Sequence, residues 1–300
     1  MSFIILDMQV FIAILIGCLY GLVEGITEWL PISSTGHMIL LSSIPGLRFD
    51  DGAFFDLFLV IIQLGAILAL VIVRFRRLNP FSAPAGPARK DVWKLWLKIL
   101  IGCIPAGVAG ILLKVLLDDR ATENLNSPLV IGIMLILVGI AFIVVERLLK
   151  VRQRKLGEER DQLFKYCEVK SIPLSVCAYI GLAQVLSLIP GTSRSGVTIL
   201  TALALGVDRV AGLEYSFYLA IPIMIGASLV SVIEFILGGG GVSGLEWAYL
   251  SAGFLVAFSV SLIVVKVLLN WIKKHTFEGF GYYRIALGAV VIGLSIGGII

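Results

Sequence analysis

Two stretches of the sequence decide how the chain folds: GLVEGITEWLPISSTGHMIL at Gly21–Leu40 and GLAQVLSLIPGTSRSGVTIL at Gly181–Leu200. They align without gaps, and two aligned pairs, Thr27/Ser187 and Thr35/Ser195, are conservative replacements. The identical pairs include Ser and Gly, which a shared apolar composition does not explain, and they are Gly21/Gly181, Leu22/Leu182, Ser33/Ser193, Gly36/Gly196, Ile39/Ile199 and Leu40/Leu200. We interpret the stretches as two copies of an internal repeat.

Each copy has the same unusual build. An apolar arm of about 16 residues meets a break rich in Pro, Ser and Gly, and a second short apolar arm follows. Neither arm reaches the length of about 20 residues that a helix needs to cross a bilayer. Irregular backbone at membrane depth is tolerated only inside protein or beside a water-filled cavity. We therefore predict that each copy forms a re-entrant helical hairpin, and paired broken segments of this kind point to a buried site.

The composition is that of a membrane protein. Apolar residues make up 59% of the 300 residues and charged residues only 15%, whereas soluble domains average about a quarter charged. Three apolar runs long enough to span a bilayer follow each hairpin, at about 54–76, 93–116, 127–147, 212–236, 246–271 and 281–300. The sequence thus predicts an all-α polytopic membrane protein with six full transmembrane helices and two re-entrant hairpins. It forms a single domain over 1–300, with repeat one at about 1–150 and repeat two at about 165–300.

Loop charges predict the orientation in the membrane. Three spans per half invert the second half relative to the first, which makes the repeat an inverted-topology one. The Lys and Arg residues between spans concentrate in three loops, and Lys273, Lys274 and Arg284 are assigned to the last of them. Because basic loops stay cytoplasmic, both termini should lie outside. The three basic loops are 74–94, 147–170 and 273–284.

Two carboxylates lie within the first hairpin. Glu24 and Glu28 are four residues apart and therefore share one helix face. An ionisable residue at membrane depth is costly and usually functional, although a position near the membrane surface is the alternative. Two carboxylates can bind a hard divalent cation, Mg²⁺ or Ca²⁺, or divide the roles of general acid and general base.

Hydroxyl groups and a histidine follow the carboxylates. Ser33, Ser34 and Thr35 are residues that cap helices, so they are expected to begin the second arm, and Ser33 and Thr35 are also predicted to bind the substrate phosphate. His37 lies three residues after Ser34, on the same face of a helix. An imidazole there can activate a hydroxyl or attack phosphorus itself, while a structural, hydrogen-bonded histidine is the alternative.

The second copy supplies the cation. Arg194 stands where the first copy has Ser34, and Ser193, Ser195 and Thr198 surround it. A guanidinium beside hydroxyls and backbone N–H groups at a helix N-terminus suits a phosphate group. One copy therefore carries the acidic groups and the other the cation, and we predict that the two hairpin tips meet to form one site. In that site, Arg194 and His37 should both reach the space of one bound anion.

Both motifs resemble a known family. The sequences EGITEWLPISSTGH at Glu24–His37 and PGTSRSGVT at Pro190–Thr198 resemble the two signature motifs of the bacterial undecaprenyl-diphosphate phosphatases, also called bacitracin-resistance proteins. FDLFLVIIQLGAILAL at Phe55–Leu70 and FYLAIPIMIGA at Phe217–Ala227 are similar to the spans that flank those motifs. The resemblance covers essentially the whole chain.

The resemblance implies an enzyme of the bacterial cytoplasmic (inner) membrane. It would remove the terminal phosphate of undecaprenyl diphosphate with the help of a divalent cation, recycle the lipid carrier of cell-wall synthesis, and open its active site toward the outer face. The motif positions considered functional in that family correspond here to Glu24, Glu28, Ser34, His37, Ser193, Arg194 and Thr198. The sequence does not choose between Ser34, His37 and water as the nucleophile.

Other functions stay open at this point. Inverted repeats with broken helices also build secondary transporters, and a lipid flippase without hydrolysis is a further alternative. The net charge of +4 is too small to indicate a nucleic-acid partner. The partner is expected to be membrane lipid and the polyprenyl diphosphate substrate, and the oligomeric state is undetermined, with a homodimer as one alternative.

The predicted orientation can be tested by chemical labelling. Single cysteines introduced at Asn79 and at Gly240 should react with a membrane-impermeant thiol reagent from opposite sides of the membrane. Labelling of both from the same side would rule out the inverted repeat.

Overall fold

The computed structural model describes residues 2–47, 49, 51–82, 84, 86–117, 121, 124–156 and 163–300. Its helices are α1 (Ser2–Thr27), α2 (Ser34–Ser42), α3 (Gly52–Val73), α4 (Phe75–Leu78), α5 (Pro87–Leu116), α7 (Pro128–Leu156), η1 (Val169–Ser171), α9 (Leu174–Gln184), η2 (Val185–Leu188), α10 (Arg194–Ala204), α11 (Arg209–Leu237), α12 (Gly244–Trp271) and α13 (Glu278–Ile296). Strand-like pairing in these ranges is limited to an isolated bridge between Tyr166 and Val207.

Seven helices in the described ranges are long and apolar enough to cross a membrane: α1, α3, α5, α7, α11, α12 and α13. This confirms the all-α polytopic membrane fold. The seventh helix, beyond the six expected, is the first arm of the first hairpin. Its predicted length of about 16 residues is wrong, because the apolar residues before Gly21 continue the helix and α1 reaches 26 residues. Length alone does not distinguish a crossing from a re-entrant arm, so the re-entrant path of α1 stays a prediction.

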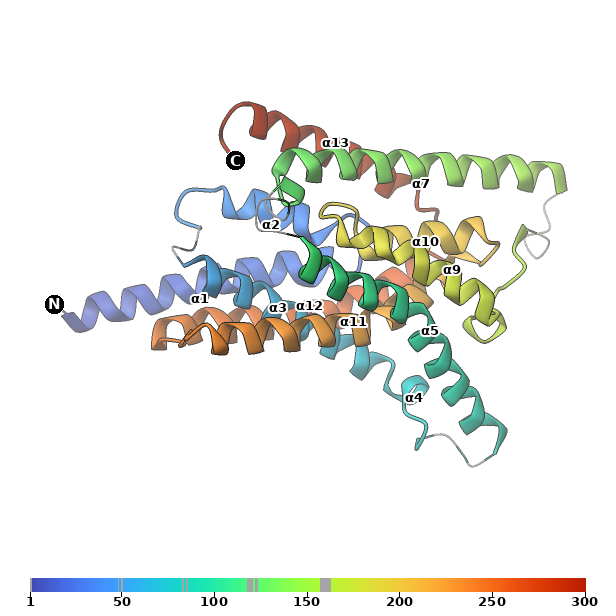
Figure 1. Cartoon of the computed structure of the whole chain (residues 1–300), viewed down its shortest axis with the longest axis horizontal. Coiled ribbons are helices and arrows are strands. Elements are labelled where there is room, and N and C mark those ends of the chain that lie inside the picture. Colours follow the sequence, from blue (N-terminus) through green and yellow to red (C-terminus); the bar gives the residue numbers. More distant parts are fainter. Residues whose placement is uncertain are drawn as a thin grey trace.

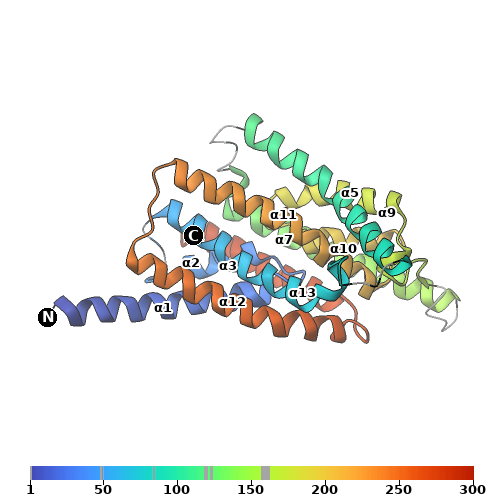
Figure 2. The same cartoon turned by 90° about the horizontal axis from the view of Figure 1, so that it is seen from below.

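The two hairpins enter the bundle from opposite ends (Figure 1). The chain folds back between α1 and α2 and again between η2 and α10, and both folds lie in the middle of the molecule. The two chain termini lie toward one end, and the C-terminal ends of α3, α7 and α12 lie toward the other, as the perpendicular view also shows (Figure 2).

One residue assigned to the basic loops lies elsewhere. The helix α13 begins at Glu278, so Arg284 lies inside it, and its side chain is completely buried. The assignment of Arg284 to a cytoplasmic loop is therefore wrong, because the helix begins at Glu278, six residues before Arg284. Lys273 and Lys274 remain in the connection between α12 and α13.

The first arm of each hairpin packs against a long helix of the other half. Helix α1 lies along α12, and α9 lies along α5. A Cβ added to Gly21 would lie 2.3 Å from the carbonyl oxygen of Gly253, and one added to Gly181 would lie 2.5 Å from that of Gly102. Only glycine permits such close backbone contact between membrane helices. Gly21 and Gly181, which align in the two copies, thus make the same kind of close contact between helices.

Helices α7 and α13 pack against each other by reciprocal contacts. Gly132 lies against the backbone of Gly288, and Gly139 lies against that of Gly281. Each helix therefore presents two glycines seven residues apart to its antiparallel neighbour. The pairing is that of a two-fold axis running between the helices, although the repeat boundaries stay a prediction.

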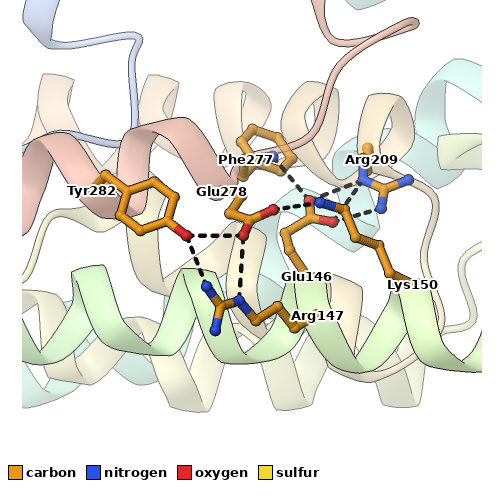
Figure 3. Close-up of polar contacts among 7 residues, drawn as sticks. All are labelled: Glu146, Arg147, Lys150, Arg209, Phe277, Glu278 and Tyr282. Atoms are coloured by element: carbon orange, nitrogen blue, oxygen red, sulfur yellow. Dashed lines mark hydrogen bonds and ion pairs between the residues drawn. The ribbon is translucent and has the colours of Figure 1, made fainter.

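A buried ion pair joins three elements at the end of the molecule opposite the termini (Figure 3). The carboxylate of Glu146, fully buried on α7, accepts hydrogen bonds from Arg209 of α11 at 2.5 and 2.9 Å and from the backbone N–H of Phe277 at 2.9 Å. Arg147 and Lys150, on the same helix, bond to Glu278 at the surface. Because a buried charge needs full compensation, this network fixes the first residues of α11 and α13 to α7.

The glycine crossings predict a sharp difference between two Gly→Ala variants. Gly21→Ala would force a methyl group onto a backbone carbonyl and should cost about 1–3 kcal/mol of stability. Gly226→Ala, in the helix α11, meets no heavy atom within 4 Å, so it should leave stability unchanged or raise it by up to about 1 kcal/mol. Thermal unfolding of both variants in detergent measures the difference, and equal midpoints would contradict the packing.

Candidate active site

The two hairpin turns hold serines in the same unusual conformation. Ser33 has a φ of 72° and Ser193 a φ of 67°, and they are the only non-glycine residues with positive φ in the described ranges. Each occupies the N-cap position of a second arm, α2 or α10, but only Ser193 caps its helix with its side chain. Such conformations cost about 1–3 kcal/mol each and cluster at functional sites. Equivalent positions of the two copies therefore carry the same backbone strain.

A single arginine holds both turns. The guanidinium of Arg284 donates to the carbonyl oxygen of Pro31 in the first turn at 3.1 Å. It also donates to the carbonyls of Gly191 and Thr192 in the second turn, at 2.8 and 3.0 Å. Its Nε donates to the carbonyl of Leu135 on α7 at 3.4 Å. Carbonyls that the broken helices leave without intrahelical partners are thereby satisfied inside the protein.

The hairpin tips meet at Glu28. Its Oε1 accepts from Nη2 of Arg194 at 3.1 Å, and its Oε2 accepts from the hydroxyl of Ser34 at 2.9 Å. Glu28 is buried, and the Arg194 side chain is only 9% exposed. Since Glu28 and Ser34 come from the first hairpin and Arg194 from the second, the polar cluster is a composite of the two. The two tips thus make the predicted contact, whereas a shared phosphate site stays a prediction.

Arg194 has a buried guanidinium nitrogen without a hydrogen-bond partner. Its Nη1 donates to the carbonyl of Ser216 on α11 at 2.6 Å, whereas its Nε is buried without a hydrogen-bond partner. Thr198 lies one turn further along α10, and its hydroxyl contacts the hydroxyl of Ser216 at 2.7 Å. Arg194 is thus fixed from the α11 side and has a free N–H for a further acceptor.

A cavity of about 160 Å³ opens beside this cluster. Its oxygen-bearing side chains are those of Glu24, Ser34, Thr35, Ser42 and Gln63, and apolar residues of α2 and α3 form the remaining wall. Oxygen donors of this kind suit Mg²⁺ or Ca²⁺. In the described ranges no three His, Cys, Asp or Glu side chains come together, so Glu24 and Glu28 would need neutral oxygens to complete such a site. The donor chemistry fits a hard cation.

His37 lies apart from the cluster. Its Nδ1 bonds to the carbonyl of Ser33 at 2.7 Å, and its Nε2 bonds to the hydroxyl of Tyr283 at 2.7 Å. A carbonyl only accepts, so Nδ1 carries the proton and Nε2 accepts from the tyrosine. The structure does not bring His37 and Arg194 to one space, because the imidazole is directed toward α13.

The remaining predicted hydroxyls serve the backbone more than the cavity. Ser193 accepts from the N–H of Gly196 at 3.2 Å, which caps α10, and its hydroxyl lies 3.1 Å from that of Ser195. Ser195 is itself buried, and so is Ser33. Of this group, only Thr35 lines the cavity beside Glu24.

Sequence reasoning missed several residues around the site. Ser216, Gln63 and Tyr283 lie in apolar helices, and no local pattern distinguishes them from other polar residues of such helices. Trp29, fully buried, fixes the first turn by an edge-to-face contact with Phe217 at 4.9 Å. Arg284 could have been found, since a lone arginine inside the apolar run at 281–300 requires an internal partner.

The fold and the site define a class of protein: a polytopic helical membrane protein whose two broken-helix hairpins join carboxylates, a hydroxyl and an arginine in one buried cluster. The chain belongs to the family described as bacitracin resistance protein BacA, whose model matches residues 17–290.

Named relatives are similar over nearly their full length. An undecaprenyl-diphosphatase of Streptococcus mutans is 44% identical over 287 residues, which are 95% of this chain and 96% of that protein. An undecaprenyl-diphosphatase of Enterococcus faecalis is 44% identical over 274 residues, 91% of this chain and 94% of that protein. Undecaprenyl-diphosphatase 1 of Clostridioides difficile is 46% identical over 273 residues, 91% and 92% of the two chains.

Two Arg→Gln variants should show that the buried Arg284 contributes more to stability than an exposed arginine does. Arg284→Gln leaves buried carbonyls of both turns without a donor, at about 1–3 kcal/mol for each group. Arg147→Gln, which removes an exposed arginine that bonds to α13, should cost at most about 1 kcal/mol. The thermal unfolding midpoint should fall by many degrees in the first variant only. Similar midpoints would mean that Arg284 does not hold the turns.

Proposed function

We propose that the protein hydrolyses undecaprenyl diphosphate to undecaprenyl phosphate and inorganic phosphate, which recycles the lipid carrier of cell-wall synthesis and confers bacitracin resistance. The observation that carries the proposal is the Glu28–Arg194–Ser34 cluster, formed where the two hairpins meet. It combines a nucleophile, a carboxylate base and a phosphate-binding cation within hydrogen-bond reach. The relatives from Streptococcus mutans and Enterococcus faecalis are named for this chemistry.

Arg194 is proposed to bind the terminal phosphoryl group. Its unused Nε–H and the guanidinium fork suit phosphoryl oxygens, and they would stabilise the charge that develops there in the transition state. The carbonyl of Ser216 accepts a hydrogen bond from the guanidinium, and the hydroxyl of Thr198 bonds to that of Ser216. Both hairpins belong to one chain, so the reaction requires no second copy.

The geometry favours Ser34 over His37 as the nucleophile. The Ser34 hydroxyl already donates to Glu28 at 2.9 Å, whereas Nε2 of His37 is hydrogen-bonded to the hydroxyl of Tyr283. Ser34 Oγ would attack the terminal phosphorus and pass its proton to Glu28 as the bond to the bridging oxygen breaks. Undecaprenyl phosphate leaves, and water then hydrolyses the phosphoserine. In the alternative course, Glu28 activates a water that attacks directly.

Glu24 and Glu28 are proposed to hold a divalent cation, Mg²⁺ or Ca²⁺, whose charge would offset that of the diphosphate. Glu24 lines the cavity beside Ser34, which suits that role. The same cavity has an apolar wall that includes Met38, Phe55 and Leu59. This wall is proposed to receive the first isoprene units of the lipid.

The proposed setting is the bacterial cytoplasmic membrane. We propose that both termini face outward, that the hairpins are re-entrant, and that the active site opens to the outer face. The excess of Lys and Arg in the loops opposite the termini supports this orientation. A transporter or flippase would need the arginine but not a hydroxyl bonded to a buried carboxylate, so that bond favours the hydrolase.

Phosphate release tests the proposal. The purified protein in detergent with Mg²⁺ should release inorganic phosphate from undecaprenyl diphosphate. Arg194→Lys keeps the charge but loses the planar fork, so kcat/KM should fall at least about 100-fold. Arg147→Lys, a surface arginine on α7, is the matched control and should keep full activity.

Two outcomes would overturn this assignment. Binding of the lipid diphosphate without any phosphate release would favour the transporter or flippase. Near-normal turnover in Arg194→Lys would mean that this arginine only supports the fold.

A further inference from the structure

A larger cavity lies away from the hairpin cluster, at the basic end of the molecule. It measures about 870 Å³ and is bounded by α4, the first turns of α5, η1 and the start of α11. Figure 1 shows α4 and the start of α5 leaning away from the bundle on this side. None of Glu24, Glu28, Ser34, His37 or Arg194 lines it. We call this cavity the α5–α11 crevice.

A buried ammonium group lies in its wall. Lys98 is only 8% exposed, and its Nζ donates to the carbonyls of Val169 at 3.1 Å and Lys170 at 2.6 Å. An ammonium has three N–H donors, so one donor remains. In the part of the chain that the structure describes, no carboxylate forms an ion pair with Lys98. A buried charge without a counter-charge is costly, and an anion in the crevice would supply one.

The other charges of the crevice leave a positive excess. Its three acidic side chains are already paired: Glu214 with Arg77 at 2.6 Å, Glu168 with Lys170 at 2.7 Å, and Asp91 with Lys94 at 3.8 Å. Arg76 also lines the crevice and, like Lys98, has no ion-pair partner among the described residues. Two of the five basic side chains therefore remain uncompensated.

The crevice also has apolar walls and lies beside side chains typical of a membrane interface. Val92, Leu95 and Val210 line it. On the outside, Trp93 and Phe81 are 54% and 77% exposed and lie edge to face at 6.5 Å. Exposed aromatic residues of this kind are enriched at the level of lipid head groups. An occupant of this crevice can thus reach it from the membrane.

We propose that the α5–α11 crevice binds the phosphate head group of an anionic membrane lipid, with the phosphate at Lys98 and Arg76 and the lipid chain along the apolar wall. The volume lies in the range of about 300–1,000 Å³ that is usual for ligand sites. Helix α11 separates this site from the hairpin cluster: Glu214 and Tyr218 face the crevice, while Ser216 between them contacts Arg194. The protein then has two phosphate sites on opposite faces of one helix.

Photoactivatable lipids test the proposal. Purified protein is irradiated with diazirine-bearing phosphatidylglycerol, undecaprenyl monophosphate or diacylglycerol, and the labelled peptides are mapped by mass spectrometry. Both phosphate lipids carry the proposed head group, and the one that labels residues 87–98 and 210–218 at lower concentration identifies the source. Diacylglycerol, which lacks phosphate, should label these peptides at least tenfold less.

Variants connect the labelling to the basic groups. Lys98→Met and Arg76→Gln should each weaken labelling about tenfold, the loss expected for one charge-assisted hydrogen bond. Lys114→Met is the matched control, because this lysine lies at the other end of α5 and pairs with Glu234. Equal labelling by diacylglycerol would overturn the proposal. Unchanged labelling in Lys98→Met would also overturn it. If Lys98→Met does not fold, unchanged labelling in Arg76→Gln would overturn it instead.

Discussion

The structure depends on one buried guanidinium. The hairpins interrupt their helices at Pro31 and at Gly191–Thr192, and each interruption leaves carbonyls that lipid cannot satisfy. Arg284 donates to both breaks and to α7. Because one planar group serves both turns, the turns cannot move apart without leaving a buried charge and several carbonyls unpaired. The position of each hairpin tip is thereby fixed relative to the other.

Contact between the two hairpin tips also compensates their buried charges. Glu28 and Arg194 would each be costly alone at membrane depth, by about 2.5–3.5 kcal/mol on insertion scales. Contact between the hairpins pairs them, and Ser34 uses the other carboxylate oxygen. The groups proposed for catalysis therefore also hold the halves together. A substrate phosphate that binds Arg194 replaces part of this pairing with its own charge.

The sequence predicted the parts that follow from composition and spacing. It placed a break in each Pro-Ser-Gly stretch, because the two copies align there, and it predicted that the acidic first tip meets Arg194 of the second, because their charges are complementary. It failed for His37, whose imidazole bonds to the carbonyl of Ser33 and to the hydroxyl of Tyr283, a residue of α13 that no local pattern links to the motif. It also assigned Arg284 to a loop. The apolar run around this arginine indicates a buried role, but its partners are backbone carbonyls of distant segments, which no local pattern identifies.

The two-fold axis between α7 and α13 relates each residue of one helix to an equivalent residue of the other. Matching the glycine pairs Gly132/Gly139 and Gly281/Gly288 aligns Leu135 with Arg284. In a dimer of two identical single-repeat chains, this position would occur twice on the symmetry axis. Two arginines would repel each other there, and two leucines would leave both turns without a donor. A single chain avoids this conflict, because its two related helices can carry different residues at the position that symmetry would force to be the same.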